Sequence, residues 1–330
     1  RAAARPVLVV FDGRYSEAVY NHIPHFQLIE ISSQKTLQTI FRDLAEKHRI
    51  KSLGFEPDSI TVSEYKLFKD QFSKISPISL TSLRILKEPS EIAYIEKACK
   101  LGDKAFEHIL TKIKKRVSEK ELAFELELFI KKQGADIAFA PIVAFGKNSS
   151  TPHHQTSDQR LKTKDQVLLD FGVRLNNYCS DMTRTVFFGS ANAEFKRMYE
   201  TVLEAQNRAI EFLNHKSSII NLKSKGVKAS RADQVARSYI ESQGYPTIPH
   251  SLGHGVGIEI HESPRLSPVS KDNLKVGMVF SIEPGIYLPG FGSPRSTRVE
   301  AGGVRIEDLV VLEKNGPRLL TLARRDFTEV

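Results

Sequence analysis

Residues 166–188, QVLLDFGVRLNNYCSDMTRTVFF, decide the fold of the larger part of this chain. Two apolar runs flank the dipeptide Asn176-Asn177, and this pattern predicts a β-hairpin with a tight turn. Asp170 ends the first run, and Asp181 precedes the second run, eleven positions later. We therefore expect the hairpin to bring these two carboxylates close together.

Two further apolar runs in the second half of the chain also end in an acid. Residues 279–283 (VFSIE) end at Glu283, and residues 304–307 (VRIE) end at Glu307. Burying an ionised carboxylate costs several kcal/mol unless something compensates its charge. One such acid can be paired with an arginine, but four acids call for a larger positive charge. Two divalent cations would supply it, and oxygen-rich ligands with one or two imidazoles suit Mn²⁺, Co²⁺ or Zn²⁺.

An imidazole is available in residues 250–262, HSLGHGVGIEIHE. Glycines on both sides of His254 let the backbone approach closely, as a ligand loop requires. His261 ends a segment, residues 257–261, that we expect to be a short strand, and it can enter the same cavity without being a ligand. No second histidine completes an H-E-x-x-H zinc motif after His261-Glu262.

Together these segments resemble the metal-binding signature of the pita-bread metallopeptidases, the clan of methionine aminopeptidase, aminopeptidase P (Xaa-Pro aminopeptidase) and prolidase. The resemblance is strong over residues 84–330. It implies two divalent metal ions, with Mn²⁺ favoured over Co²⁺ and Zn²⁺, and a proton shuttle at Glu283. The implied metal ligands are Asp170, Asp181, His254, Glu283 and Glu307.

The same resemblance assigns residues to catalysis and to the substrate. His153 and His261 match histidines that position the substrate and stabilise the tetrahedral intermediate, and His250 matches a further substrate-binding histidine of the Xaa-Pro enzymes. Arg305 is also a substrate-binding candidate. Its position two residues before Glu307 fits equally a residue that orients a ligand or an ordinary ion-pair partner.

Other side chains near these motifs have plain structural interpretations. We expect Tyr287 to pack in the core and Arg184 to stabilise the hairpin. Cys179 is expected to be a small buried residue, because a thiolate would be out of place among oxygen ligands.

The first 83 residues predict a smaller domain of the α/β class. Strand-like residues 5–11 and 50–55 enclose a helical run near residues 35–48. The segment FDGRY, residues 11–15, resembles the creatinase-like N-terminal domain, of which we expect a truncated form. Residues 73–82 (SKISPISLTS) are poor in helix signals and are expected to be a linker.

Residues 84–330 predict an α+β domain, the expected pita-bread catalytic domain. Capping patterns that begin at Glu88, Ser118 and Ser230 open helices, and the strand-like segments that carry the acids and histidines lie between and after these helices. The division expected from the sequence is therefore residues 1–83 and residues 84–330.

The resemblance implies an exopeptidase that hydrolyses the Xaa-Pro bond at the N-terminus of peptides, because the Xaa-Pro branch carries an N-terminal domain and methionine aminopeptidase does not. We expect aminopeptidase P, which cleaves longer peptides, with the dipeptide-cleaving prolidase as the alternative. Residues 289–303 lie between two ligand strands and are expected to border the cleft. A metal-free binding protein of this fold would lack several of the five ligands, and none is missing.

The composition fits a globular protein and restricts its partners. The 330 residues are 40% hydrophobic and 26% charged, enough for about two domains with real cores. No apolar run approaches the ~20 residues that span a bilayer, and two cysteines form no disulfide framework. We therefore expect a cytoplasmic protein without a membrane partner. The net charge of +9 is scattered among acids, and lysine-rich tails are missing, so we expect no nucleic-acid partner. A homodimer is expected from the resemblance.

Overall fold

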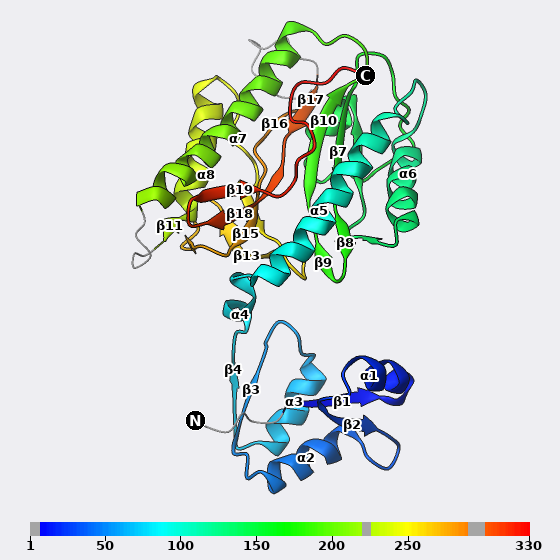
Figure 1. Ribbon diagram of the computed structural model, residues 1–330, viewed down its shortest axis with the longest axis vertical. Helices are drawn as coiled ribbons and strands as arrows, with labels where there is room; N and C mark the ends of the chain where they lie inside the picture. Colours follow the sequence, from blue (N-terminus) through cyan, green and yellow to red (C-terminus); the bar gives the residue numbers. More distant parts are fainter. Residues whose placement is uncertain (1–6, 220–225, 290–300) are drawn as a thin grey trace. The chain divides into compact units, whose positions relative to one another are not determined.

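The structure is a computed structural model that describes residues 7–219, 226–289 and 301–330 (Figure 1). The chain divides into two compact units, Arg1–Leu80 and Thr81–Val330. Within the described ranges, no helix is both long enough and apolar enough to cross a membrane. Most of the expected cleft-edge loop, residues 290–300, lies outside the described residues.

The first unit consists of two β-α-β crossovers. In each, a helix connects two parallel strands, so the expected α/β class is observed. A further helix, α2, lies between the two crossovers along the chain. The Thr61 side chain and Glu64 form a capping box at the start of α3. The elements are β1 (Leu8–Asp12), α1 (Ser16–His22), β2 (Gln27–Ile31), α2 (Leu37–Lys47), β3 (Ser52–Phe55), α3 (Val62–Gln71) and β4 (Lys74–Pro77).

The linker expected over residues 73–82 is a wrong prediction. Residues Lys74–Pro77 form β4, which pairs in parallel with β3, and residues Thr81–Ile85 form the short helix α4. The proline misled the interpretation. Pro77 is the last residue of its strand, where a missing N–H does not interrupt the pairing.

The second unit has helices on both sides of antiparallel strands, the α+β arrangement expected. Helices α5 and α6 lie to one side of the strands, and α7 and α8 lie to the other (Figure 1). Each pair has its own apolar core: α5 and α6 pack against β6, β7 and β10, whereas α7 and α8 pack against β15 to β18. The helices are α5 (Pro89–Leu110), α6 (Glu119–Lys132), α7 (Ala193–Ile219) and α8 (Ala229–Ser242).

The strands of this unit form several antiparallel sheets. The largest has the order β13-β12-β15-β18-β19, and a three-stranded sheet has the order β10-β7-β6. The strands are β5 (Asp136–Ile137), β6 (Ile142–Phe145), β7 (Gln166–Phe171), β8 (Val173–Leu175), β9 (Tyr178–Cys179), β10 (Met182–Phe187), β11 (Val227–Lys228), β12 (Gly253–Gly255), β13 (Glu262–Leu266), β14 (Asn273–Leu274), β15 (Val279–Ile282), β16 (Gly285–Leu288), β17 (Gly302–Arg305), β18 (Asp308–Glu313) and β19 (Gly316–Leu319).

The hairpin predicted over residues 166–188 is confirmed. Asn176 and Asn177 both have left-handed backbones, with φ of 51° and 67°, as a two-residue hairpin turn requires. In the β7–β10 pair Asp170 faces Thr183, so Asp181 lies two residues before the partner of Asp170.

Three other predictions for this unit need correction. Residues 257–261 form bends, and the strands lie on either side, in β12 and β13. Helix α8 begins at Ala229, and Asp233 does not cap it but accepts hydrogen bonds from Arg237 and from the backbone of Leu252. Helix α7 was not among the predicted elements, since its buried face is built partly of alanines, which are a weak periodic signal.

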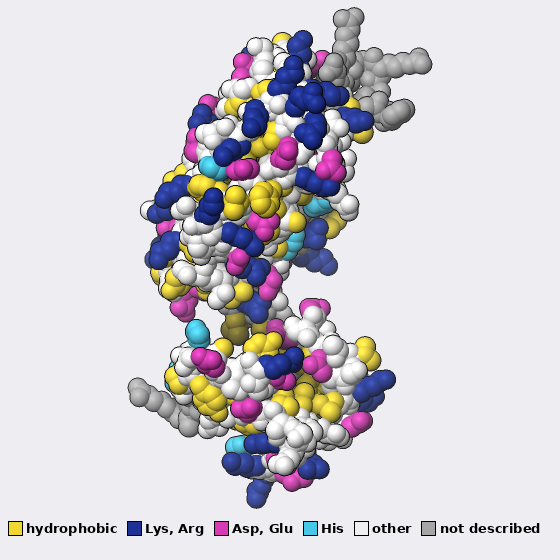
Figure 2. Space-filling view, turned by 90° about the vertical axis from the view of Figure 1, so that its right-hand side faces the viewer, with side chains coloured by type: hydrophobic (Ala, Val, Ile, Leu, Met, Phe, Trp, Pro, Cys, Tyr) yellow, Lys and Arg dark blue, Asp and Glu magenta, His cyan; other side chains and the backbone are white. Residues whose placement is uncertain are grey.

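Surface charge is mixed on the face drawn in Figure 2. Lysine and arginine side chains are interspersed with aspartate and glutamate over much of it. The expectation that the protein has no nucleic-acid partner stays a prediction.

Glu119, the first residue of α6, fixes the segment that carries His153. Its side chain is fully buried, and its carboxylate accepts hydrogen bonds from Phe145 N (2.8 Å), Asn148 Nδ2 (2.8 Å), His154 Nε2 (2.9 Å), Ser157 N (2.9 Å) and Ser157 Oγ (2.6 Å). Burial alone would raise the pKa of this carboxyl, but the donated hydrogen bonds outweigh burial and lower it. One buried anion thus holds both ends of residues 145–157.

We predict that Glu119→Gln lowers the free energy of unfolding by about 3 kcal/mol, because several buried donors would lose a charged acceptor. Glu127→Gln is the matched control. Glu127 lies on the same helix in an exposed ion pair with Lys131, so its change should stay within about 0.5 kcal/mol. Urea denaturation followed by circular dichroism measures both variants, and equal effects would contradict the prediction.

Candidate metal centre and active site

The five expected metal ligands lie in or next to strands of the second unit. Asp170 lies in β7, and Asp181 directly precedes β10. His254 lies in β12. Glu283 follows β15, and Glu307 lies between β17 and β18. Both glutamates therefore sit where regular strand pairing stops, which frees their side chains from the alternation of a continuous strand.

Four of these residues converge within a few ångströms. Ligand atoms of Asp181, His254 and Glu307 all lie within 4.8 Å of one another. His254 Nε2 is 3.6 Å from Asp181 Oδ2 and 3.4 Å from Glu283 Oε1. With metal–ligand distances of about 2.0–2.2 Å, two donor atoms on one ion lie about 3–3.5 Å apart, so this spacing fits shared ligation.

The charges of the cluster also fit a bound cation. Asp170, Asp181 and Glu307 are buried, and Asp181 Oδ1 is one of few buried side-chain atoms in the described residues without a hydrogen-bond partner. Burial and mutual repulsion raise the pKa of Asp181 and of Glu307 well above the ordinary value, and burial raises the pKa of Glu283 to about 8. The carboxylates need a positive charge that the chain supplies only in part.

His254 is oriented for ligation by its own backbone. Its Nδ1 lies 3.1 Å from the carbonyl oxygen of Gly255, which can only accept, so Nδ1 carries the proton. The Nε2 lone pair is then free to face the carboxylates. Burial lowers the pKa of His254 to about 4, which keeps the ring neutral. A Cβ at Gly253 would come within 2.0 Å of the Ser281 carbonyl oxygen, so glycine is required there.

Arg305 lies inside the cluster and pairs with an expected ligand. Its Nη2 is 2.5 Å from Asp170 Oδ2, and its Nε donates to Thr183 Oγ1 at 3.0 Å. The Thr183 hydroxyl in turn donates to Glu307 Oε2 at 2.7 Å. Of the interpretations open from the sequence, the geometry therefore favours a residue that orients ligands, because Arg305 contacts one ligand directly and a second through Thr183.

The expectation that Tyr287 packs in the core is incomplete. Its ring is buried, but Arg305 Nη1 donates to its hydroxyl at 2.9 Å, and the hydroxyl lies 2.8 Å from His250 Nε2. His250 Nδ1 faces the Ser251 carbonyl oxygen and so carries the ring proton. Nε2 therefore accepts a hydrogen bond from the Tyr287 hydroxyl. Burial lowers the pKa of His250 to about 4. In the sequence, the only indication that Tyr287 lies at the site is its position four residues after Glu283.

His153 and His261 lie near the cluster. Both are exposed, and both act electrostatically on Asp170, whose pKa is raised by burial and lowered in turn by Arg305 and these two rings. The His261 ring lies 4.4 Å from the His254 ring in an edge-on arrangement.

A cavity of about 450 Å³ adjoins the site at His250. Arg237 and Arg265 are among the residues that line it. Arg265 also favours the charged form of Glu283 and disfavours that of His254, so its positive charge is felt within the cluster. Neither arginine was predicted from the sequence to lie at the site.

We predict that the metal-free protein loses thermal stability between pH 7 and pH 8.5. The carboxyl pKa values are raised in the folded state, so this stabilisation is present below the unfolded pKa of 4.5 and is lost as the pH rises through about 8 at Glu283. The Tm with excess chelator should fall over this range, whereas the Tm with saturating Mn²⁺ should not.

Glu283→Gln is the control for this pH effect. The variant has no titrating group at this position, so its metal-free Tm should fall less between pH 7 and pH 8.5. Equal slopes for the two proteins would show that Glu283 is not responsible.

Comparisons with known proteins agree with this geometry. The family described as metallopeptidase family M24 matches residues 93–314, and the creatinase/prolidase N-terminal domain matches residues 2–86. The Xaa-Pro dipeptidase of Pyrococcus furiosus is 40% identical over 284 residues, which are 84% of this chain and 75% of the relative.

Solved structures give the same result. An Xaa-Pro dipeptidase from Bacillus anthracis has a TM-score of 0.85 and 35% identity, covering 99% of this chain and 87% of that one. An X-Pro aminopeptidase from Thermotoga maritima has a TM-score of 0.86 and 32% identity, covering 99% and 88%. The expected fold, a pita-bread domain preceded by a creatinase-like domain, is confirmed. The chain belongs to metallopeptidase family M24 and carries the creatinase/prolidase N-terminal domain.

Proposed function

We propose that this protein is an Xaa-Pro dipeptidase that depends on two divalent metal ions. The observation that carries the proposal is the convergence of four side chains, those of Asp181, His254, Glu283 and Glu307. Asp170 lies beside them in an ion pair with Arg305. Mn²⁺ remains the favoured metal. A cytoplasmic location and a homodimer remain predictions.

The choice of dipeptidase departs from the aminopeptidase expected first. The relatives named above include an Xaa-Pro dipeptidase at 40% identity and another at 35%, so the alternative, prolidase, is better supported than aminopeptidase P. The X-Pro aminopeptidase at 32% identity shows that the same fold serves both substrate lengths. Substrate length is therefore the property to measure.

Bound metal ions would supply an activated water and neutralise the charge that develops on the scissile carbonyl oxygen. Asp170, Asp181, His254, Glu283 and Glu307 would hold them. Such ions would also remove the repulsion that raises the carboxyl pKa values in their absence.

Protons and charge are then handled by the protein's own side chains. Glu283 has a pKa of about 8 without metal, so it readily takes a proton and can pass it to the leaving prolyl nitrogen. His261 and His153, which are exposed beside the carboxylates, would donate hydrogen bonds to the substrate and to the oxyanion. His250 and Tyr287 extend this polar wall toward the adjoining cavity.

Arg265 supports a dipeptide as the substrate. A dipeptide carries its free carboxylate one residue beyond the scissile bond, within reach of a cation at the edge of the site. Arg265 is exposed, lines the cavity and acts on the cluster electrostatically, so it is suited to bind that carboxylate. A longer peptide places a neutral amide there instead.

We predict metal-dependent hydrolysis of Gly-Pro by the purified protein, and slower hydrolysis of a longer Xaa-Pro-Yaa peptide. Chelation should abolish cleavage, and added Mn²⁺ or Co²⁺ should restore it. Preferential cleavage of the longer peptide would establish aminopeptidase P instead. If the folded protein binds no metal and cleaves neither peptide, it is a binding relative of the fold.

We predict that Glu283→Gln lowers kcat for Gly-Pro by about 10²- to 10⁴-fold, because the amide cannot carry the proton to the leaving nitrogen. Bound metal is measured alongside, to separate proton transfer from lost ligation. Glu259→Gln, an exposed glutamate of the same region, is the matched control and should leave kcat unchanged. Equal activity of both variants would exclude Glu283 as the proton shuttle.

A further inference from the structure

Glu283 lies between strands β15 and β16, and Glu307 lies between strands β17 and β18. We call residues 282–285 and 305–308 the ligand turns. Ile282 faces Asp308 in the β15–β18 pair, so the two turns are neighbours across the sheet. What fixes these turns fixes two of the five proposed metal ligands.

One buried amide contacts both ligand turns. Gln206, in α7, is fully buried, and its Nε2 lies 3.0 Å from the Ile282 carbonyl oxygen and 3.3 Å from the Ile306 carbonyl oxygen. The first carbonyl belongs to the Ile282–Glu283 peptide group and the second to the Ile306–Glu307 peptide group, so each directly precedes a proposed metal ligand. The same Nε2 lies 3.0 Å from Asp308 Oδ2.

The opposite side of each peptide is held as well. Glu283 N donates to the Leu252 carbonyl oxygen at 2.7 Å, and Glu307 N donates to the Thr183 carbonyl oxygen at 3.1 Å. Because a peptide is planar, a hydrogen bond at its C=O and another at its N–H together fix the orientation of the whole plane. Both ligand peptides are thus fixed at both ends, with Gln206 supplying one end of each.

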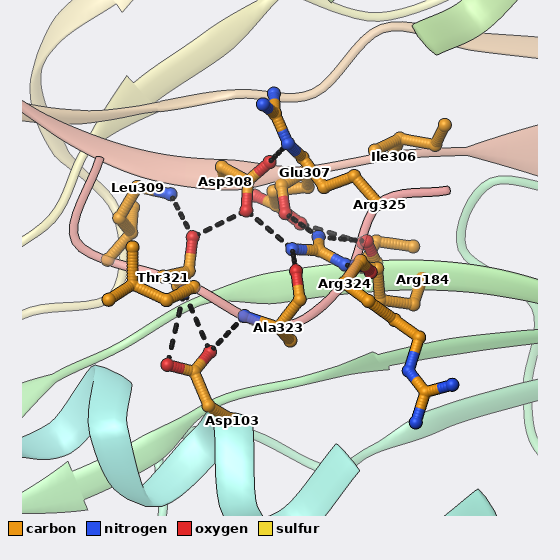
Figure 3. Close-up of polar contacts among 12 residues, drawn as sticks. Asp103, Arg184, Ile306, Glu307, Asp308, Leu309, Thr321, Ala323, Arg324 and Arg325 are labelled. Atoms are coloured by element: carbon orange, nitrogen blue, oxygen red, sulfur yellow. Dashed lines mark hydrogen bonds and ion pairs between the residues drawn. The ribbon is translucent and has the colours of Figure 1, made fainter. Parts of the chain in front are cut away.

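The orientation of the Gln206 amide is itself determined. Arg325 Nη1 donates to Gln206 Oε1 at 3.1 Å, so Nε2 is the atom that faces the carbonyls. Arg325 belongs to the C-terminal segment, residues 321–325, which lies beside Glu307 and Asp308 in Figure 3.

Asp308 and Arg184 complete the arrangement on the Glu307 side. The Asp308 carboxylate is fully buried and accepts from Arg184 Nη2 at 2.6 Å and from Thr321 Oγ1 at 2.6 Å. Arg184 Nη1 donates to the Glu307 carbonyl oxygen at 2.6 Å. Arg184 also donates to the carbonyls of Ala323 and Arg324, while Asp103 of α5 accepts from the Ala323 amide (Figure 3).

This arrangement corrects the expectation for Arg184. The side chain does more than stabilise its own hairpin, because four of its hydrogen bonds reach residues 307–324 and one reaches Thr183. Removing any buried partner would leave polar groups unsatisfied, which is costly in a low dielectric.

We propose that Gln206 and Asp308 are positioning residues that hold the ligand turns so that Glu283 and Glu307 reach the metal ions together. Neither side chain is a proposed ligand. The proposal rests on the metal dependence proposed above, and it extends that dependence to α7 and to the C-terminal segment, which carry no ligand. Outer hydrogen-bond partners of this kind typically change metal affinity by about 10- to 100-fold when removed.

The test is Mn²⁺ binding to the chelator-treated full-length protein, with free Mn²⁺ measured by electron paramagnetic resonance. Gln206→Met preserves side-chain length but removes the amide, and it should raise the Kd for Mn²⁺ by about 10-fold or more. Thr321→Val removes one donor from Asp308, together with the acceptor of the Leu309 N–H, and should raise the Kd by a smaller factor, about 3-fold. This mild variant decides the question if Gln206→Met fails to fold.

Two controls separate positioning from general stability. Gln234→Met makes the same chemical change on the exposed face of α8 and should leave the Kd unchanged. Ile130→Val lowers the metal-free Tm by disturbing the core of α6 and should also leave the Kd unchanged.

The outcomes are distinct. An unchanged Kd in both Gln206→Met and Thr321→Val, together with a lowered metal-free Tm, would reduce Gln206 and Asp308 to ordinary structural residues and overturn this inference while leaving the proposed function intact. A wild-type protein that binds no Mn²⁺, Co²⁺ or Zn²⁺ would overturn both. A raised Kd in the two variants but not in the controls is the result expected.

Discussion

The burial of four carboxylates close to one another is the constraint on which this structure depends. Asp170, Asp181, Glu283 and Glu307 all have raised pKa values, and burial is the largest cause in each. Arg305 offsets part of this charge through Asp170. The remainder is what a pair of divalent ions would neutralise, so the same energy that destabilises the metal-free fold would drive metal binding.

The surrounding fold makes this concentration of charge possible. Asp170 lies within the paired strand β7, the other three carboxylates lie where regular pairing stops, and close backbone approach at Gly253 admits His254. Around them lies a layer of uncharged and paired donors: Thr183 for Glu307, Ser281 for Glu283, and Gln206 for the peptides of both glutamates. These contacts orient Glu283 and Glu307 in the absence of an ion, which would reduce the reorganisation that metal binding requires.

The residues proposed to bind substrate lie beside the same cluster. His153 and His261 are exposed, and the Arg305–Tyr287–His250 chain of hydrogen bonds leads from the carboxylates to the cavity that Arg265 borders. The segment with His153 depends on a separate buried anion, Glu119, in another part of the unit. The proposed metal ligands and the proposed substrate-binding residue His153 therefore draw on different structural supports, and we expect single variants to affect them separately.

The sequence by itself determined the α+β class, the hairpin around Asn176-Asn177 and the five ligand candidates, because acids inside apolar runs and glycines beside a histidine are local signals. It misplaced the strand at residues 257–261 and the linker at residues 73–82, where pairing with distant strands decides the structure. Only the tertiary structure showed that Tyr287 joins the site, that Arg305 pairs with Asp170, and that Gln206, Asp308 and Arg184 support the ligand turns. Those side chains act through partners tens to more than a hundred positions away, and no local pattern encodes such a distance.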